Sequence, residues 1–249
     1  IFYSMDRQVI RQFHALAQVV RSRGEHYRMI KQHLPPRSLI VARHFHSGDA
    51  RRRNDPSSEL IGFDPQLEPF MEAHQIRGDN LRMMDEYGPR TVRHFLHAGC
   101  KLGLVGGTDH ALGKGPDHFG LTGFWLDELT PEAVWQALWE RRTYSVCNAR
   151  ITLWATMNDC VLGDEAEAWA PLRFQVQASC PFPLTRLYLQ RDGEIVAEQT
   201  VDSTTAECEL VDAEPRPGPH WYVVSAEARS RFMHQPAVAH LSPFFIAVP

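Results

Sequence analysis

Residues 91–110 weigh most in the predicted fold, and they read TVRHFLHAGCKLGLVGGTDH. Thr91 to Gly99 predicts a short helix that a glycine closes. Leu102 to Gly107 then predicts a buried strand that runs into a glycine turn. A helix followed by a buried strand is typical of α/β proteins, in which strands and covering helices alternate. We therefore predict an α/β fold for this part of the chain.

The residues upstream of this stretch predict a helix and two further strands. Ser4 is suited to cap a helix that begins near Met5, and Gly24 is suited to end it. Residues 38–42 (SLIVA) form a short apolar run that suits a buried strand, and residues 69–74 give a weaker signal of the same kind.

Downstream, Thr130 and Pro131 predict a helix start, because a capping hydroxyl is followed by proline in the first turn. From about residue 150 the pattern changes to short alternating strands. Asp192-Gly193 predicts a hairpin turn between two of them. Further strands are expected around residues 174–178, 187–189, 208–210, 221–225 and 244–248. Short strands with turns between them favour a small antiparallel sandwich.

Composition excludes several classes of protein. The chain has 249 residues and a formal net charge of -4, which argues against a nucleic-acid surface. No apolar run approaches the length that a membrane span needs. The five cysteines form no close pair, which favours structural thiols and a cytoplasmic setting over a disulfide framework. The chain begins at Ile1 without a signal-peptide pattern, so we expect a piece of a longer protein and leave its localisation open.

The strongest candidate site residues are Asp109 and His110, at the tip of the predicted strand 102–107. Catalytic groups collect at strand C-termini in α/β proteins. Carboxylate and neutral imidazole are good ligands for zinc, manganese or iron. His44 and His46 follow another predicted strand, and an H-x-H pattern on a strand places both imidazoles on one side. The alternative for each pair is a structural role in a loop.

Glu72 and His74 repeat this strand-end pattern more weakly, and here too a structural role is the alternative. The sequence contains no G-x-S-x-G elbow and no Cys-His-Asn pattern, so a covalent serine or cysteine hydrolase lacks support.

Residues 91–110 resemble the helix, strand and "G-S/T-D-x-H" segment of metal-dependent hydrolases of the PHP superfamily. Four further segments match the CehA/McbA, or carbaryl-hydrolase-like, branch in order. They are GLTGFW (120–125), ELTPEAVWQAL (128–138), RRTY (141–144) and ARI (149–151).

The resemblance implies the C-terminal part of a PHP-type (β/α) barrel over residues 1–150, followed by an antiparallel β-sandwich domain over residues 151–249. It also implies divalent metal ions, with zinc, manganese and iron all open. Residues 41–44 stand where the family has an I-P-H-H segment, and residues 69–72 resemble its P-L-V-E segment. On this mapping the ligand candidates are His44, Glu72, Asp109 and His110, of which Asp109 and His110 are also the catalytic candidates. Three features depart from the family: its N-terminal H-x-H strand has no counterpart, Phe45 replaces its second histidine, and Ala111 stands where many members have histidine.

The implied activity is hydrolysis of a phosphoester, ester or carbamate by metal-activated water. The alternative is a truncated or degenerate relative that catalyses nothing and serves as a binding or interaction module. We expect a small-molecule substrate, no nucleic-acid partner and no membrane, and we leave the oligomeric state open.

Overall fold

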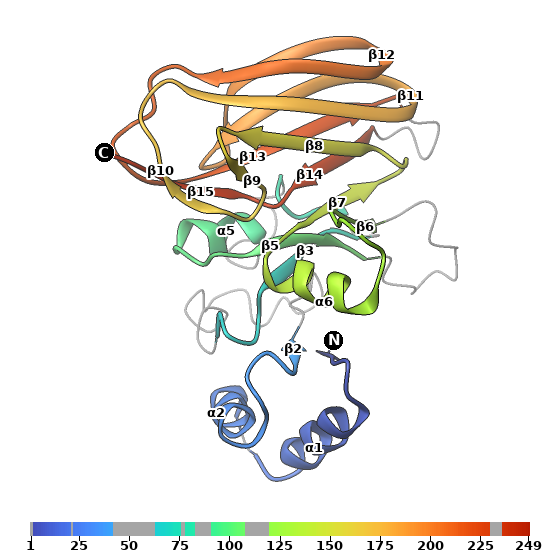
Figure 1. The fold of residues 1–249 in the computed structure, drawn as a ribbon, viewed down its shortest axis with the longest axis vertical. Helices are drawn as coiled ribbons and strands as arrows, with labels where there is room; N and C mark the ends of the chain where they lie inside the picture. Colours follow the sequence, from blue (N-terminus) through green and yellow to red (C-terminus); the bar gives the residue numbers. More distant parts are fainter. Residues whose placement is uncertain are drawn as a thin grey trace.

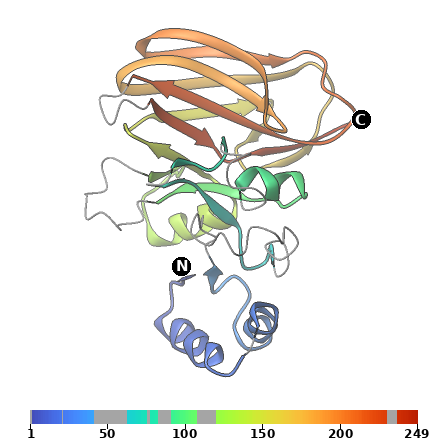
Figure 2. The same cartoon turned by 180° about the vertical axis from the view of Figure 1, so that it is seen from behind.

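The computed structural model describes residues 2–20, 22–41, 63–75, 78–82, 91–107, 120–229 and 236–249. Three parts follow one another along the long axis (Figure 1): a pair of N-terminal helices, a small sheet with two helices beside it, and a large curled sheet. The view from behind shows the same order, with the N-terminal helices at the end opposite the large sheet (Figure 2). The small sheet therefore lies between the other two parts.

The N-terminal part consists of a two-stranded ribbon and two helices, and its own hydrophobic cluster includes Phe13 and Ile30. Its elements are β1 (Phe2–Tyr3), α1 (Arg7–Ala17), α2 (Arg23–His33) and β2 (Ile40–Val41). The two strands pair antiparallel, with Tyr3 opposite Ile40. The chain therefore returns to its starting point after the two helices.

The predicted boundaries of the first helix are wrong at both ends. Asp6 caps α1 by accepting a hydrogen bond from the Gln8 N–H. Ser4 lies two residues before the cap: its hydroxyl accepts the Asp6 N–H at 3.1 Å and donates to the backbone oxygen of Ser38 at 2.6 Å. The helix ends at Ala17, and Gly24 lies inside α2.

The small sheet has the order β4-β3-β5. Its strands are β3 (Phe70–Gln75), β4 (Gly78–Asp79) and β5 (Gly103–Gly106), and α5 (Val92–His97) precedes β5. Strand β3 pairs antiparallel with β4 and parallel with β5, so α5 lies on the crossover between two parallel strands. The Thr91 hydroxyl caps α5, which confirms the predicted helix and strand of this stretch.

The large sheet has ten strands among the described residues. They are β6 (Gly120–Phe124), β7 (Thr143–Cys147), β8 (Thr152–Met157), β9 (Cys160–Val161), β10 (Glu165–Glu167), β11 (Leu172–Arg191), β12 (Glu194–Asp212), β13 (Gly218–Ala228), β14 (Ala237–Leu241) and β15 (Phe244–Val248). The main path is β6-β7-β14-β13-β11-β8-β9, while β12 pairs with β11, and β15 links β13 to β10. Strands β6 and β7 therefore join a sheet that consists mainly of residues beyond 150.

The hairpin of β11 and β12 is the longest feature of this sheet. Leu172, Phe174 and Val176 are buried while the residues between them are exposed, which confirms the predicted alternation. Asp192 and Gly193 form the turn with positive φ angles of 50° and 83°. Such angles suit the tight turns of hairpins, and the predicted turn is confirmed.

The predicted (β/α) barrel is wrong. Helix α6 (Pro131–Trp139) connects β6 to β7, and these two strands pair antiparallel with Gly120 opposite Cys147. In a barrel the helix would connect parallel neighbours. Among the described strands, parallel pairing occurs between β3 and β5 and between β10 and β15. The helix–strand pattern was correct locally, but it does not repeat around a closed barrel.

The C-terminal part is β-sandwich-like, because the large sheet curls around one main core. Phe174 packs against Tyr222 and Phe244 in this core, with ring centroids 5.4 and 5.3 Å apart. A separate cluster that includes Phe95 and Trp221 joins α5 to the outer face of the large sheet. No helix in the described ranges is long and apolar enough to cross a membrane.

Candidate functional site

Glu72 lies in the middle of β3, opposite Val105, and its side chain reaches Gly107 just after the end of β5. Its side chain is buried, with 8% exposure. Its Oε2 accepts a hydrogen bond from the Gln75 side-chain amide at 2.9 Å. Its Oε1 faces Gly107, where an added Cβ would overlap the carboxylate. The Gly107 N–H donates to the His74 backbone oxygen at 2.9 Å, so the chain that leaves β5 is held against β3.

The end of the N-terminal ribbon also lies near this carboxylate. Burial and the negative charge of Glu72 raise the pKa of Tyr3. The Tyr3 ring lies 6.2 Å from that of Phe70, and Tyr3 pairs with Ile40 in β2. Val41 is the last described residue before the segment that contains His44. Strand β2 therefore ends in the same region as β3 and β5.

Of the four predicted metal ligands, Glu72 lies among the described residues. His44, Asp109 and His110 lie outside them, as does His46, and their roles stay predictions. The description stops at Gly107, two residues before Asp109, at the point where the backbone contacts Glu72. The structure thus places Glu72 beside the start of the predicted Asp109-His110 segment.

A second polar cluster is formed by His74, Asp79 and His240. His74 and Asp79 are register partners in β3 and β4, and His240 comes from β14 of the large sheet. The His240 Nε2 lies 2.9 Å from the Asp79 Oδ2, and the His74 Nε2 lies 3.6 Å from the same oxygen. The two imidazole rings stack with centroids 4.9 Å apart and planes 7° apart. Three groups that often bind metals therefore meet at the interface of two sheets.

Two serines orient the two imidazoles from behind. The Ser145 hydroxyl lies 3.0 Å from the His74 Nδ1, and the Ser225 hydroxyl lies 2.7 Å from the His240 Nδ1. Each ring consequently presents its Nε2 to Asp79. His74 has 1% exposure and His240 has 0%, so the cluster is closed to bulk water on the histidine side.

These side chains belong to a row of polar residues that crosses five strands of the large sheet. Register pairs connect its members in the order Thr122, Ser145, His240, Ser225 and Tyr188. Four of the five hydrogen-bond to the small sheet or the residues that follow it, and Ser225 acts through His240. We call this set the polar row. It docks the small sheet on the large one.

Arg82 forms the exposed end of this interface. Its guanidinium contacts the Tyr188 hydroxyl and the Glu227 carboxylate, and its Nε lies 3.3 Å from the Asp79 Oδ2. Arg186 reaches the same Glu227 at 3.0 Å from the other side. Two cations and one carboxylate thus close the interface toward solvent.

The buried cluster has strongly shifted proton affinities. Burial would raise the pKa of Asp79, but His240 and His74 hold the pKa of this carboxyl well below its usual range. Burial lowers the pKa of His240. Burial acts the same way on His74, yet the Cys147 sulfur and Asp79 beside it raise the pKa of His74 to about 10.

The sequence indicates one member of this cluster, His74, which shares a predicted strand end with Glu72. It does not indicate Asp79 or His240. Asp79 and His240 are 161 positions apart, so no local spacing connects them. The available signal was a histidine in AVAHL, a strand in which every residue is buried. A buried imidazole must find polar partners, which points to a network without naming its members.

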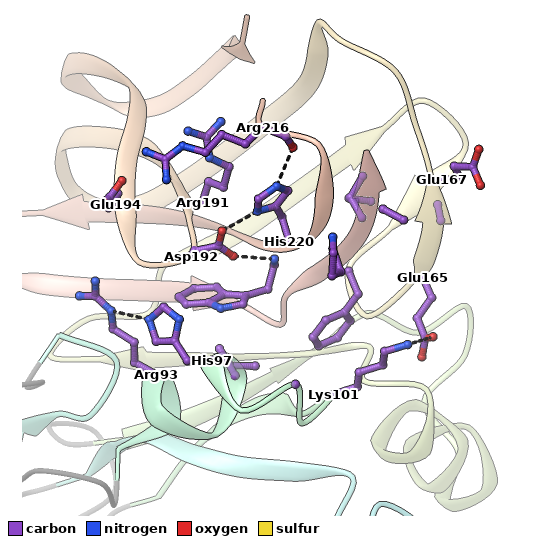
Figure 3. Close-up of a pocket in the computed structure, with 18 residues that line it drawn as sticks. Arg93, His97, Lys101, Glu165, Glu167, Arg191, Asp192, Glu194, Arg216 and His220 are labelled. Atoms are coloured by element: carbon purple, nitrogen blue, oxygen red, sulfur yellow. Dashed lines mark hydrogen bonds and ion pairs between the residues drawn. The ribbon is translucent and has the colours of Figure 1, made fainter. Parts of the chain in front are cut away.

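A groove of about 920 Å³ lies between α5 and the edge of the large sheet (Figure 3). Its charged groups are largely paired with one another: the His220 Nδ1 lies 2.5 Å from the Asp192 Oδ2, and Lys101 pairs with Glu165. His97 lies edge-on to Trp221, with ring centroids 5.6 Å apart. The groove is thus a mixed polar and aromatic surface without a concentration of one charge.

No protein-family model matches the chain, and no curated protein matches it. Solved structures that resemble it cover part of the chain. A lytic polysaccharide monooxygenase from Jonesia denitrificans aligns with 12% identity and a TM-score of 0.24, over 34% of this chain and 58% of its own. The chain thus spans less than two thirds of that enzyme.

Two smaller domains align over most of their own length. A CARDB domain from Pyrococcus furiosus, solved in complex with di-metal ions, has 10% identity and a TM-score of 0.29 over 41% of this chain and 89% of its own. The fibronectin(III)-like modules of Clostridium thermocellum CbhA have 13% identity and a TM-score of 0.26 over 38% and 93%.

Proposed function

We propose that this protein is a metal-dependent hydrolase of a phosphoester, ester or carbamate, with Glu72 as a metal ligand. His44, Asp109 and His110 are the other proposed ligands. Asp109 and His110 are also the proposed catalytic residues, with His110 as a ligand or general acid. The proposal rests on the resemblance of residues 91–110 to PHP-type hydrolases and on the surroundings of Glu72. It does not require a barrel, because the site needs only the ends of β2, β3 and β5.

One observation carries the proposal: the buried Glu72 carboxylate faces Gly107, and no side chain fits between them. Its Oε2 accepts a hydrogen bond from Gln75, and its Oε1 points at the backbone that leads to Asp109. This arrangement of carboxylate oxygens suits a hard or borderline divalent cation.

The residues around Glu72 have separable tasks in this proposal. Gln75 fixes the orientation of the carboxylate through its amide. Gly107 lets the chain after β5 approach without displacing it. Tyr3 keeps its proton at neutral pH, because burial and the charge of Glu72 raise its pKa. A bound divalent cation supplies Lewis acidity and makes water acidic enough to attack a carbonyl or phosphoryl centre.

The test compares Glu72→Gln with the wild type after loading with Mn²⁺ or Zn²⁺. Metal content and hydrolysis of p-nitrophenyl phosphate, its diester and p-nitrophenyl acetate are measured on the same samples. We expect the wild type to hydrolyse at least one of these. The variant should lose at least about 100-fold in turnover and the metal equivalent that Glu72 binds, because a neutral amide is a poor replacement for a ligating carboxylate.

Glu68→Gln is the matched control, because Glu68 is also a buried carboxylate on the same segment. It accepts a hydrogen bond from Tyr27 at 2.9 Å and lies away from Gly107. This variant should lose stability but keep metal content and turnover. Equal losses in both variants, or a metal-loaded wild type without turnover, would instead support a binding module without catalysis.

A further inference from the structure

His74, Asp79 and His240 bring three metal-binding groups into a space that a single ion would fill. Their donor atoms all lie within 4.8 Å of one another. Two donors on a tetrahedral zinc ion, each 2.0–2.1 Å from the metal, lie roughly 3.3 Å apart. The two distances from the Asp79 Oδ2, 2.9 and 3.6 Å, lie on either side of this value. Rotation of the two stacked rings, whose planes are 7° apart, would turn both Nε2 lone pairs onto one ion.

The surroundings of the three residues match those of metal ligands. A ligating histidine normally hydrogen-bonds through its other ring nitrogen, which fixes the ring. Ser145 and Ser225 serve both histidines in this way. The Asp79 Oδ1 accepts the Leu81 N–H at 3.1 Å, and this contact turns Oδ2 toward the histidines.

One atom of the cluster lacks a hydrogen-bond partner. The His74 Nε2 is buried, points toward the Asp79 Oδ2 from beyond hydrogen-bond distance, and finds no other donor or acceptor among the described residues. A buried polar atom that makes no hydrogen bond is costly, so a native structure should have a reason for it. A coordinated ion would satisfy this nitrogen.

We propose that His74, Asp79 and His240 bind a transition-metal dication such as Zn²⁺, which fastens the small sheet to the large sheet. Two imidazoles and one carboxylate favour such borderline ions over Mg²⁺ or Ca²⁺. The ligands come from β3, β4 and β14, so binding stabilises the contact between the sheets. The Arg82 Nε lies 3.3 Å from the Asp79 Oδ2, so metal binding would replace this contact while the guanidinium keeps Tyr188 and Glu227.

This site is independent of the proposed hydrolase site, so its test uses the Glu72→Gln background. Metal-free Glu72→Gln protein is titrated with Co²⁺ while visible absorption is recorded. We expect one equivalent to bind with the intense d–d bands of a tetrahedral ion. Zn²⁺ should displace the cobalt and raise the thermal unfolding midpoint.

Four additional substitutions in this background assign the site. Asp79→Asn and His240→Gln should each abolish the cobalt bands and the zinc-induced rise of the midpoint. Ser225→Ala keeps every ligand and should weaken zinc binding about 10- to 100-fold, because it frees the His240 ring. His220→Gln removes a histidine of a surface histidine–aspartate pair and should change neither readout.

Two results would overturn this proposal. One is the absence of tetrahedral bands in folded Glu72→Gln protein at a molar excess of Co²⁺. The other is binding that Ser225→Ala and Asp79→Asn both leave unchanged, even if His240→Gln fails to fold. Loss of hydrolysis in Glu72→Gln tests only the proposed hydrolase site. The hydrolase proposal and the metal-site proposal can therefore be disproved independently.

Discussion

At Gly107 the backbone approaches the Glu72 carboxylate so closely that an added Cβ would overlap Oε1. The glycine is needed here for space, because its φ angle is not among the positive ones. A glycine is therefore needed at position 107 because the Glu72 carboxylate lies next to it. A substitution at this position tests that carboxylate without altering its charge.

We expect Gly107→Ala to lower metal-dependent turnover at least about 10-fold, because the new methyl group displaces a proposed ligand. Gly24→Ala is the control, since nothing lies within 4 Å of a Cβ at Gly24 in α2. The control should raise the free energy of unfolding by about 0.5–1 kcal/mol and keep turnover. Steady-state kinetics measures the turnover of each variant, and urea unfolding measures its free energy of unfolding. Full activity in a folded Gly107→Ala protein would contradict the role of Glu72.

Single residues of the candidate sites were predictable to different degrees. Glu72 was found because it belongs to a segment that resembles a known family, and because it falls near the end of a predicted strand. The Glu72–Gly107 contact was not predicted, since the parallel pairing of β3 with β5 decides it. Asp79 and His240 meet through the docking of two sheets, which no local pattern encodes.

At the level of elements, the polar row decides how the small sheet sits on the large one. At the exposed edge of the same interface, the Glu227 carboxylate contacts two arginines, Arg82 and Arg186. Burial would raise the pKa of Glu227, but Arg82 and Arg186 outweigh it and lower the pKa below the ordinary 4.5. A carboxyl group with a depressed pKa in the folded state stabilises the protein above its unfolded pKa. This contribution is lost as the pH falls through the folded pKa.

Glu227→Gln should therefore lower the free energy of unfolding by about 1 kcal/mol at pH 7, a value discounted for partial exposure. The difference from the wild type should shrink as the pH falls below about 4.5 and vanish below the depressed folded pKa, where the carboxylate is protonated in both states. Urea unfolding at a series of pH values measures it. Glu198→Gln, which contacts Arg186 from a more exposed position, should cost at most about 0.5 kcal/mol. A Glu227 effect that did not depend on pH would count against this interpretation.

Elements with strong local signals were predicted well. The alternation of Phe174 and Val176 and the Asp192-Gly193 turn gave the β11–β12 hairpin. Thr130 capped α6 as its position suggested, through the Ala133 N–H. The first helix failed because Ser4 bonds to Ser38, a tertiary contact that sequence spacing does not reveal. Asp6 then takes the capping role.

For the whole molecule, the barrel that the family resemblance implied was wrong, because the helix–strand unit around residues 91–107 does not repeat in the strands that follow. Whether α6 connects parallel or antiparallel strands depends on the partner that β7 finds, and β7 pairs with β14 near the end of the chain. The β-sandwich-like C-terminal part was predictable, because residues such as 172–178 alternate between buried and exposed and turn residues separate the strands. A domain boundary at residue 150 stays a prediction, since the large sheet continues through β6 and β7.

We propose that Glu72 binds a catalytic metal ion near the ends of β2, β3 and β5. A crystal of the protein soaked in Mn²⁺ tests this, with anomalous diffraction recorded near the manganese edge. We expect an anomalous peak within coordination distance of a Glu72 carboxylate oxygen, with side chains from the segments after β2 and β5 around it. A crystal with manganese bound elsewhere and no peak beside Glu72 would contradict it.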